Sequence, residues 1–432
     1  MEESKPFISC GKLSSLYLYV LYSITFKCLN DFILTFQTVN AEKKGGFFGE
    51  SELNNHILLK SFYKYISFMI FGKLFLYFID RKKSEDFGKQ KELIYNNPEQ
   101  KISISNITYI YLAIICLLYV LYLELIEISY SLGFHDYDLW IFNIVFFLLF
   151  MQIYHPTKIF KHQSFSLLFI FFTNFIILII QSFYPRAHNV YDWTNDILGN
   201  KFYSILFYLI YIINSCMISF SRVFAKVLME FKYISPYTII ILIGIFGFIF
   251  TSILICISSA FTCRGTLKEK ICNVANLNYQ TTDTNVYYDS IVVYWNNMKY
   301  NFQNKKSKFW KEVIIIYPLN LFLNFMVFNY EILLTYYLNP MYMLISDSLY
   351  YGTKTIITFI LNSKEKDDII KFILYLWSNI FAFFGYLIFV EIIELNFCDL
   401  SENTRRAIGE RGIRDTLLSQ EINVHLEEEE DS

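Results

Sequence analysis

Residues 237–259 read YTIIILIGIFGFIFTSILICISS, a run without a single charged side chain. An uninterrupted apolar stretch of roughly 18 or more residues predicts a transmembrane helix, because about 20 helical residues cross the hydrocarbon core of a bilayer. Hydrophobic residues make up 55% of the 432-residue chain, and charged residues make up only 18% and are clustered. We therefore expect a polytopic membrane protein.

Further apolar runs predict an all-α fold of about ten transmembrane helices. They lie near residues 13–37, 57–79, 108–132, 139–160, 164–184, 202–226, 237–259, 312–336, 340–362 and 368–395. The first run is longer than the apolar core of a signal peptide and lacks a clear small-residue cleavage site, so we expect it to remain as a span. Pro340 suits the start of a helix, where its missing N–H is harmless.

Lys and Arg in the connections predict the orientation. They gather in 80–105, in 222–232 and in the segment after the last span. With ten spans these segments share one side of the membrane, and an excess of positive charge marks the cytoplasmic side. We therefore expect both termini in the cytosol, a long luminal connection over 260–311, and a disordered cytoplasmic tail over 397–432 that ends in an acidic block.

Composition also bears on cofactors and partners. The formal net charge of -2 gives no reason to expect nucleic acid. Eight Cys and six His are dispersed, without a CxxC or a Cys/His metal pattern, so we expect neither a metal nor another cofactor. Cys263 and Cys272 fall in the expected luminal connection, where a disulfide and two unpaired thiols are equal alternatives.

The two halves of the chain carry a short echo of each other. The echo pairs Ile24-Thr25-Phe26-Lys27 with Ile218-Ser219-Phe220-Ser221-Arg222, and Phe71-Gly72 with Phe246-Gly247. An odd number of spans in each half would invert the second half relative to the first, as in many carriers. We therefore predict one five-helix repeat over 1–185 and a second, inverted repeat over 200–396.

Ionisable residues inside the predicted spans indicate where function resides. A charge at the bilayer centre costs roughly 2.5–3.5 kcal/mol or more, so it needs a partner or a wet cavity. Lys27 and Asp31 are i and i+4 in the first span and share a face. They form either a substrate- or ion-binding pair or a self-neutralising pair. Lys73, inside the second span, is either a binding residue or a side chain that snorkels to the cytoplasmic interface.

Later spans add further carboxylates and cations. Glu124 and Glu127 are i and i+3 in the third span, and because adjacent carboxylates repel at low dielectric, one would tend to keep a proton. That suits proton coupling, with Glu124 the better placed. The alternative is neutralisation by a cation of another helix, such as Lys27 or Lys73. Arg222 and Lys226 share a face of the sixth span, which suits an anionic substrate. For Lys226, ordinary anchoring on the cytoplasmic side is the alternative.

The ninth span supplies the last pair. Asp347 and Lys354 are two turns apart, on a face with Tyr350 and Tyr351, and both lie deep enough to need partners. Glu331, in the eighth span, is expected near the interface instead. The predicted substrate-binding residues are Lys27, Asp31, Lys73, Glu124, Arg222, Asp347 and Lys354.

Four short segments resemble a known family. They are the Lys27/Asp31 stretch, His56 to Gly72, Ile234-Ser235-Pro236 with Gly244 to Phe248, and Glu391 to Cys398 with Asn403 to Arg406. Together they resemble the drug/metabolite transporter superfamily and, within it, the nucleotide-sugar-transporter-like solute carrier family 35. The resemblance implies ten helices in two inverted repeats, a central cavity, alternating access and residence in an endomembrane such as the Golgi, the ER or the vacuole/lysosome.

The chain departs from that family at one place. Relatives in this branch often carry acidic residues in the sixth span before the proline, where this sequence reads Phe224-Ala225-Lys226-Val227. The fourth span lacks a clear basic substrate motif, for which it offers only Gln152 and His155. The family's substrates are therefore not carried over to this chain.

We expect a secondary transporter of a polar or anionic metabolite rather than an enzyme, with a homodimer as one possible assembly. A non-transporting membrane scaffold that acts through its tail and its 260–311 connection is the alternative. A membrane-embedded transferase is the remaining alternative, with His135-Asp136-Tyr137-Asp138 as its best candidate cluster. Solute uptake by the purified protein would discriminate the carrier from both.

Overall fold

The fold is all-α, as the sequence predicts. A computed structural model describes residues 8–10, 18–42, 56–80, 106–131, 140–154, 161–183, 201–231, 234–260, 291–304, 306–338, 340–361, 369–389 and 391–395. These residues are almost entirely helical, apart from the three-residue strands β1 (Ile8–Cys10) and β2 (Ile393–Leu395). The predicted Cys263/Cys272 pair, the tail over 397–432 and the 135–138 cluster lie outside the described residues.

Helices occupy the segments in which the sequence predicts spans. They are α1 (Leu18–Glu42), α2 (Ile57–Phe75), α4 (Asn106–Ser131), α5 (Trp140–Tyr154), α6 (Lys161–Phe183), α8 (Lys201–Phe231), α9 (Pro236–Ala260), α13 (Tyr317–Tyr337), α14 (Pro340–Leu361) and α15 (Ile369–Phe389). Two π-helical turns adjoin this set: η3 (Leu76–Asp80) extends α2, and η6 (Glu312–Ile316) precedes α13.

Two predicted boundaries need correction. The 260–311 connection is not loop throughout, because it contains α11 (Ile291–Asn304) and α12 (Lys306–Lys311). The last helix ends at Phe389 instead of continuing to 395. Glu391 has a φ of 63°, a left-handed conformation that an α-helix cannot continue through, and the chain then enters β2.

The helices carry apolar side chains on their outer surfaces as well as in the core. On α9, Ile245, Ile249 and Ile253 form an exposed stripe at steps of four residues, while Ile239 and Ile243 are fully buried. A helix that is hydrophobic all round fits a lipid environment better than water. Within the described residues, five helical segments are long and apolar enough to cross a membrane, and they lie in α4, α8, α9, α13 and α15. These features indicate an integral membrane protein.

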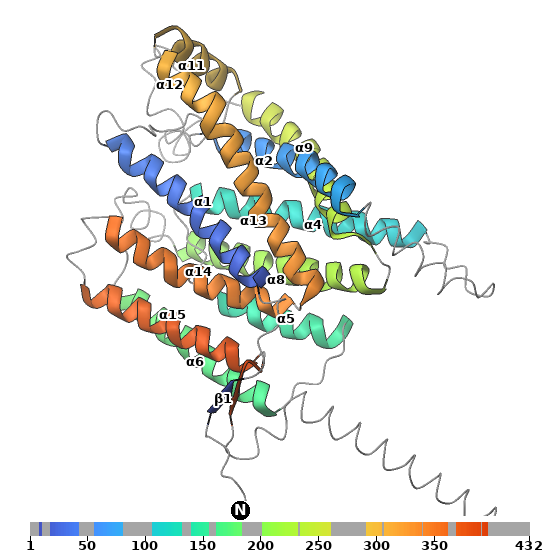
Figure 1. Cartoon of the computed structure of the whole chain (residues 1–432), viewed down its shortest axis with the longest axis vertical. Coiled ribbons are helices and arrows are strands. Elements are labelled where there is room, and N and C mark those ends of the chain that lie inside the picture. The colour runs from blue at the N-terminus through green and yellow to red at the C-terminus, as the bar shows by residue number, and fades with distance from the viewer. Residues whose placement is uncertain are drawn as a thin grey trace, which may run out of the picture.

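The helices pack as neighbours in a regular pattern. On one side α1 contacts α13 and α14, and α14 contacts α15; on the other α8 contacts α4 and α5. Figure 1 shows α13, α1, α14 and α15 in front of α4, α8, α5 and α6. At one end of the bundle α2 packs against α9, with α13 against α2 and α4 against α9; at the other α6 packs against α15.

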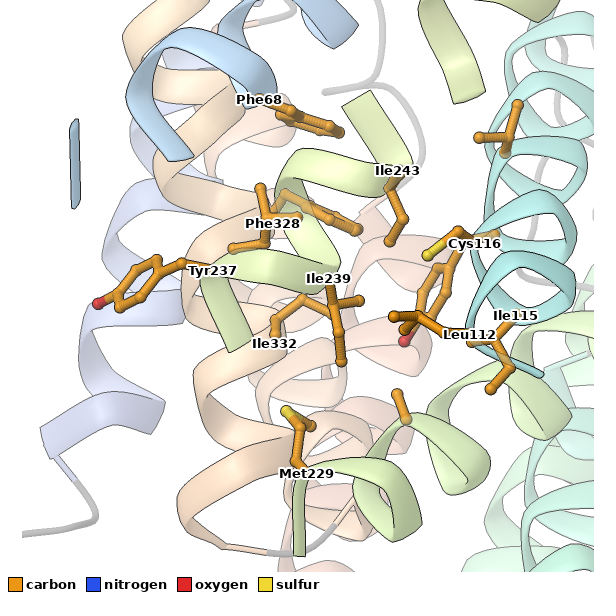
Figure 2. Packing of buried hydrophobic residues seen from close by; sticks show 14 of the residues in the cluster. Phe68, Leu112, Ile115, Cys116, Met229, Tyr237, Ile239, Ile243, Phe328 and Ile332 are labelled. Atoms are coloured by element: carbon orange, nitrogen blue, oxygen red, sulfur yellow. The ribbon is translucent and has the colours of Figure 1, made fainter. Parts of the chain in front are cut away.

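The largest apolar core joins α2, α4, α8, α9 and α13. Figure 2 shows Ile239 and Ile243 of α9 between Phe328 and Ile332 of α13 and the α4 side chains around Cys116. The contact of α2 with α9 depends on small residues. A Cβ added at Gly244 would lie 3.0 Å from the backbone N of Met69 and 3.0 Å from the carbonyl O of Tyr65. The two backbones therefore cross too closely for any larger residue.

The two ends of the described chain are joined. β1 and β2 pair antiparallel, with Ile8 opposite Leu395 and Cys10 opposite Ile393. The Leu395 N–H donates to Nε2 of His162 (3.3 Å), and Nε2 of Gln163 donates to the Phe389 carbonyl (3.4 Å). The segment before α1, the segment after α15 and the beginning of α6 therefore meet at one end of the bundle.

Candidate functional site

Three helices bring opposite charges together around Lys27. Its Nζ lies 2.6 Å from Oδ1 of Asp347 on α14 and 2.8 Å from Oε1 of Glu331 on α13. Lys27 itself is only 7% exposed. A single ammonium group therefore holds α1 against both of its neighbours with two short, charge-assisted contacts.

Arg222 of α8 is the second cation of this cluster. Its Nη2 lies 3.9 Å from Oε2 of Glu331, and its guanidinium carbon lies 6.0 Å from the ring centroids of Tyr122 on α4 and Phe147 on α5. A planar guanidinium can pair with a carboxylate and interact with aromatic faces at once. Arg222 thus links α8 to α13 by charge, and to α4 and α5 through their rings. We call Lys27, Arg222, Glu331 and Asp347 the central cluster.

Serine hydroxyls accompany both cations, about one turn earlier in each helix. Ser346 Oγ donates to Ser23 Oγ at 2.9 Å, joining α14 to α1. Ser219 Oγ donates to the carbonyl of Asn143 at 3.3 Å, joining α8 to α5. Ser23 shares a helix face with Lys27, and Ser219 shares one with Arg222, because residues three or four apart lie on the same side of a helix.

The central cluster is electrically balanced, with two cations and two carboxylates. Lys27 and Arg222 are buried, and the Glu331 and Asp347 side chains are 19% and 16% exposed. A buried charge is tolerated only when it is paired and hydrogen-bonded. The four groups therefore depend on one another. A ligand that entered here would have to exchange its own charges for those of the pairs.

A second group of charges lies between α2 and α4. Glu127 accepts from Lys60 Nζ at 3.2 Å and from Lys64 Nζ at 3.3 Å. Glu124, one turn earlier on α4, is 2% exposed, and neither of its carboxylate oxygens has a hydrogen-bond partner among the described residues. We call Lys60, Lys64, Glu124 and Glu127 the α2–α4 cluster. The cations at Glu127 therefore come from another helix, but they are Lys60 and Lys64 and not Lys27 or Lys73, which the sequence suggests.

The predicted site residues thus have different locations. Lys27, Arg222 and Asp347 meet in the central cluster, whereas Glu124 belongs to the α2–α4 cluster. Lys73 is exposed on α2, because it lies off the face through which Gly72 and Phe68 contact neighbouring helices. It is therefore not part of either cluster.

Three further residues complete the comparison with the sequence. Lys354 is half-buried beside Tyr350 of its own helix, with its Nζ 3.4 Å from the phenol oxygen. Asp31 lies in α1, and its side chain is outside the described residues. Lys226 pairs with Glu230 at 2.7 Å and donates to the Tyr336 carbonyl near the end of α13. These contacts join α8 to the end of α13, and cytoplasmic anchoring stays a prediction.

Glu331 is the member of the central cluster that sequence reasoning missed. It lies a few residues from the end of the predicted 312–336 span, which made an interfacial position the natural expectation. In the structure it pairs with Lys27 and approaches Arg222. The sequence offers no clear signal for it, because Asp31 and Asp347 already provide carboxylates for Lys27 and Arg222.

A scan of protein-family models and a search of curated proteins found no match to this chain.

Proposed function

We propose that this protein is a secondary carrier of a polar or anionic metabolite, working by alternating access across an endomembrane. In this proposal the ten helices over the predicted spans cross the membrane as two inverted five-helix repeats. The first contains α1, α2, α4, α5 and α6, and the second contains α8, α9, α13, α14 and α15. The proposed relation to the drug/metabolite transporter superfamily rests on the short sequence resemblances alone.

The neighbour pattern of the helices supports the two repeats. In chain order, α1, α2, α4, α5 and α6 of the first half correspond to α8, α9, α13, α14 and α15 of the second. If each helix is exchanged for its counterpart, the contacts of α1 with α13 and α14 become those of α8 with α4 and α5. The same exchange turns α4 against α9 into α13 against α2, and it leaves the pairs α2–α9 and α6–α15 unchanged. All these contacts occur in the structure. The α2–α9 crossing fits the same exchange. Aligning Gly72 with Gly247 in the two halves also aligns Met69 with Gly244, and these two equivalent residues contact each other across the crossing.

The central cluster is the observation that carries the proposal. Lys27 belongs to the first half, and Arg222, Glu331 and Asp347 belong to the second, so the ion pairs of Lys27 cross between the halves. Carriers of inverted-repeat design bind substrate at such a junction and move one half against the other around it. An anionic group of the substrate would compete with Glu331 and Asp347 for Lys27 and Arg222, and so loosen the halves.

The connection between β1 and β2 supports an even number of spans. Because the strand before α1 pairs with the strand after α15, both termini are expected on the same side of the membrane. The positive charges of the connections favour the cytosol for that side. Protease protection of tags at the two ends, in sealed vesicles from expressing cells, tests this orientation.

Uptake into proteoliposomes tests the function. The purified full-length chain is reconstituted and offered radiolabelled nucleotide sugars, sugar phosphates and dicarboxylates. We expect saturable uptake of at least one of them. Lys27→Ala and Arg222→Ala should each abolish it, while Lys73→Ala, an exposed lysine of similar chemistry, should leave it unchanged.

Two results would overturn this assignment. Uptake that persists in Lys27→Ala and Arg222→Ala would remove the central cluster from the substrate path. Absence of uptake of every offered metabolite, with a correctly folded protein, would favour the scaffold alternative.

A further inference from the structure

Glu124 is a deeply buried carboxyl that the central cluster does not use. The neighbouring hydroxyls of Ser61 and Tyr65, both on α2, are also buried and also lack hydrogen-bond partners among the described residues. Both hydroxyls lie next to the Glu124 carboxyl. Three polar groups thus face one another inside an apolar helix contact without completing a single strong hydrogen bond. Buried polar groups in this condition call for an explanation.

The charges around Glu124 come from few elements. From α2, Lys64 acts on the carboxyl, and Lys60 binds the adjacent Glu127. The α8 cations are engaged elsewhere, Arg222 near Glu331 and Lys226 with Glu230. Helix α9, which also packs on α4, contains no Asp, Glu, Lys, Arg or His. Among the described residues, Glu124 therefore has no cation of its own, since Lys64 is shared with Glu127.

A proton is the ligand that fits this place. Lys64, which acts on the carboxyl, would repel a metal ion. A buried carboxylate without a cation of its own is costly to keep ionised, and binding a proton removes that cost. Hydroxyls accept as well as donate, so Ser61 and Tyr65 suit both states of the carboxyl. When a proton from water bonds to one carboxylate oxygen, the new O–H can donate to a hydroxyl oxygen; on release, the hydroxyls donate to the carboxylate.

We propose that Glu124 is a reversible proton-binding site and that its proton is the coupling ion of the carrier; the coupling rests on the proposed function. The link to transport is the helix pair that holds the site. Helix α2 also packs against α13, which carries Glu331, and α4 packs against α8, which carries Arg222. When Glu124 loses its proton, a second negative carboxylate joins that of Glu127 beside the two lysines of α2. The charge balance between α2 and α4 then changes, and with it the contact between the helices that flank the central cluster.

Infrared difference spectroscopy tests the proton site without any substrate. The full-length protein in lipid is titrated with acid and base, and the carbonyl band of protonated carboxylic acids is followed. The other carboxyl groups of the chain contribute to every spectrum, so we expect one reversible component of the band that is missing in Glu124→Gln and retained in Glu127→Gln, the matched change one turn away. Tyr65→Phe should keep the band but shift its position, because one neighbour of the carbonyl is removed. Circular dichroism checks that each variant keeps its helices.

Proteoliposome uptake then separates the two proposals. With a transported metabolite in hand, an imposed pH gradient should change wild-type uptake and should have no effect on Glu124→Gln. Titrations of the wild type and Glu124→Gln that give the same bands overturn the proton site even if uptake is intact. A band that depends on Glu124, without uptake of any metabolite, leaves the proton site standing and overturns the carrier. Uptake of Glu124→Gln that still responds to the gradient overturns the coupling.

Discussion

The central cluster and the α2–α4 cluster both contain buried charges and are both balanced in formal charge, yet they are built differently. In the central cluster each charge comes from a different helix, and all four groups are within 4 Å of an opposite charge. In the α2–α4 cluster the charges come from two helices, and Glu124 is left without a hydrogen bond among the described residues. The first arrangement joins many helices, whereas the second keeps one group free to change its charge.

Removing Lys27, the cation shared by Glu331 and Asp347, should have the largest effect on stability. Lys27→Met leaves Glu331 and Asp347 buried beside an apolar side chain. Losing one partner of a buried ion pair costs about 3–5 kcal/mol. We expect a strongly lowered Tm of the purified protein, measured by tryptophan fluorescence, and no comparable change in Lys73→Met, whose side chain is exposed. Equal Tm values for the two variants would contradict the role given to the central cluster.

The same substitution on successive turns of α4 should sharpen the contrast. Glu127→Gln weakens two charge-assisted contacts, with Lys60 and Lys64, and should cost up to about 3 kcal/mol of unfolding free energy. Glu124→Gln removes a charge that has no hydrogen bond to lose and should leave the stability unchanged or raised. Thermal unfolding at neutral pH compares the two variants. A greater loss for Glu124→Gln would show that the partners were assigned wrongly.

A glycine substitution tests the close crossing of α9 with α2, the helix that carries the lysines of the α2–α4 cluster. Gly244→Ala places a methyl 2.9 Å from Cγ of Met69 and 3.0 Å from its backbone N, and overpacking of this kind typically costs about 1–3 kcal/mol. Gly352→Ala is the matched control, because its methyl meets nothing closer than Cβ of Asn379 at 3.5 Å. The control should be neutral or slightly stabilising, as alanine favours helix over glycine by up to about 1 kcal/mol. Unfolding temperatures of both variants give the comparison.

The smallest effect should come from the neutral contacts beside the central cluster. Ser346→Ala removes the hydrogen bond to Ser23, and a hydrogen bond of this kind contributes about 1 kcal/mol. Thr353→Ala, which loses only a contact with the Leu349 carbonyl within its own helix, is the control. A Ser346→Ala variant that loses as much as Lys27→Met would mean that the serines, and not the charges, hold α1 against α14.

The sequence predicted much of the fold because apolar runs of about 20 residues are an unambiguous signal. Sequence-based prediction is less reliable where a helix depends on a few residues. The φ of 63° at Glu391 ends the last helix early, and α11 is too polar to be recognised from an apolar run. For the central cluster, depth along a span identified Lys27, Arg222 and Asp347. It could not identify Glu331, because depth does not reveal which way a helix faces or which helix lies beside it.

The antiparallel contact of β1 with β2 nearly closes the described helices into a ring. Residues 8–10 and 393–395 are adjacent, so in a variant trimmed to residues 8–395 a short linker could join these two strands without moving a helix. The chain could then be opened elsewhere, between α9 and α11 for instance, to give a permuted polypeptide that begins with the second part of the bundle. The order in which the helices are synthesised would change, while their neighbours would stay the same.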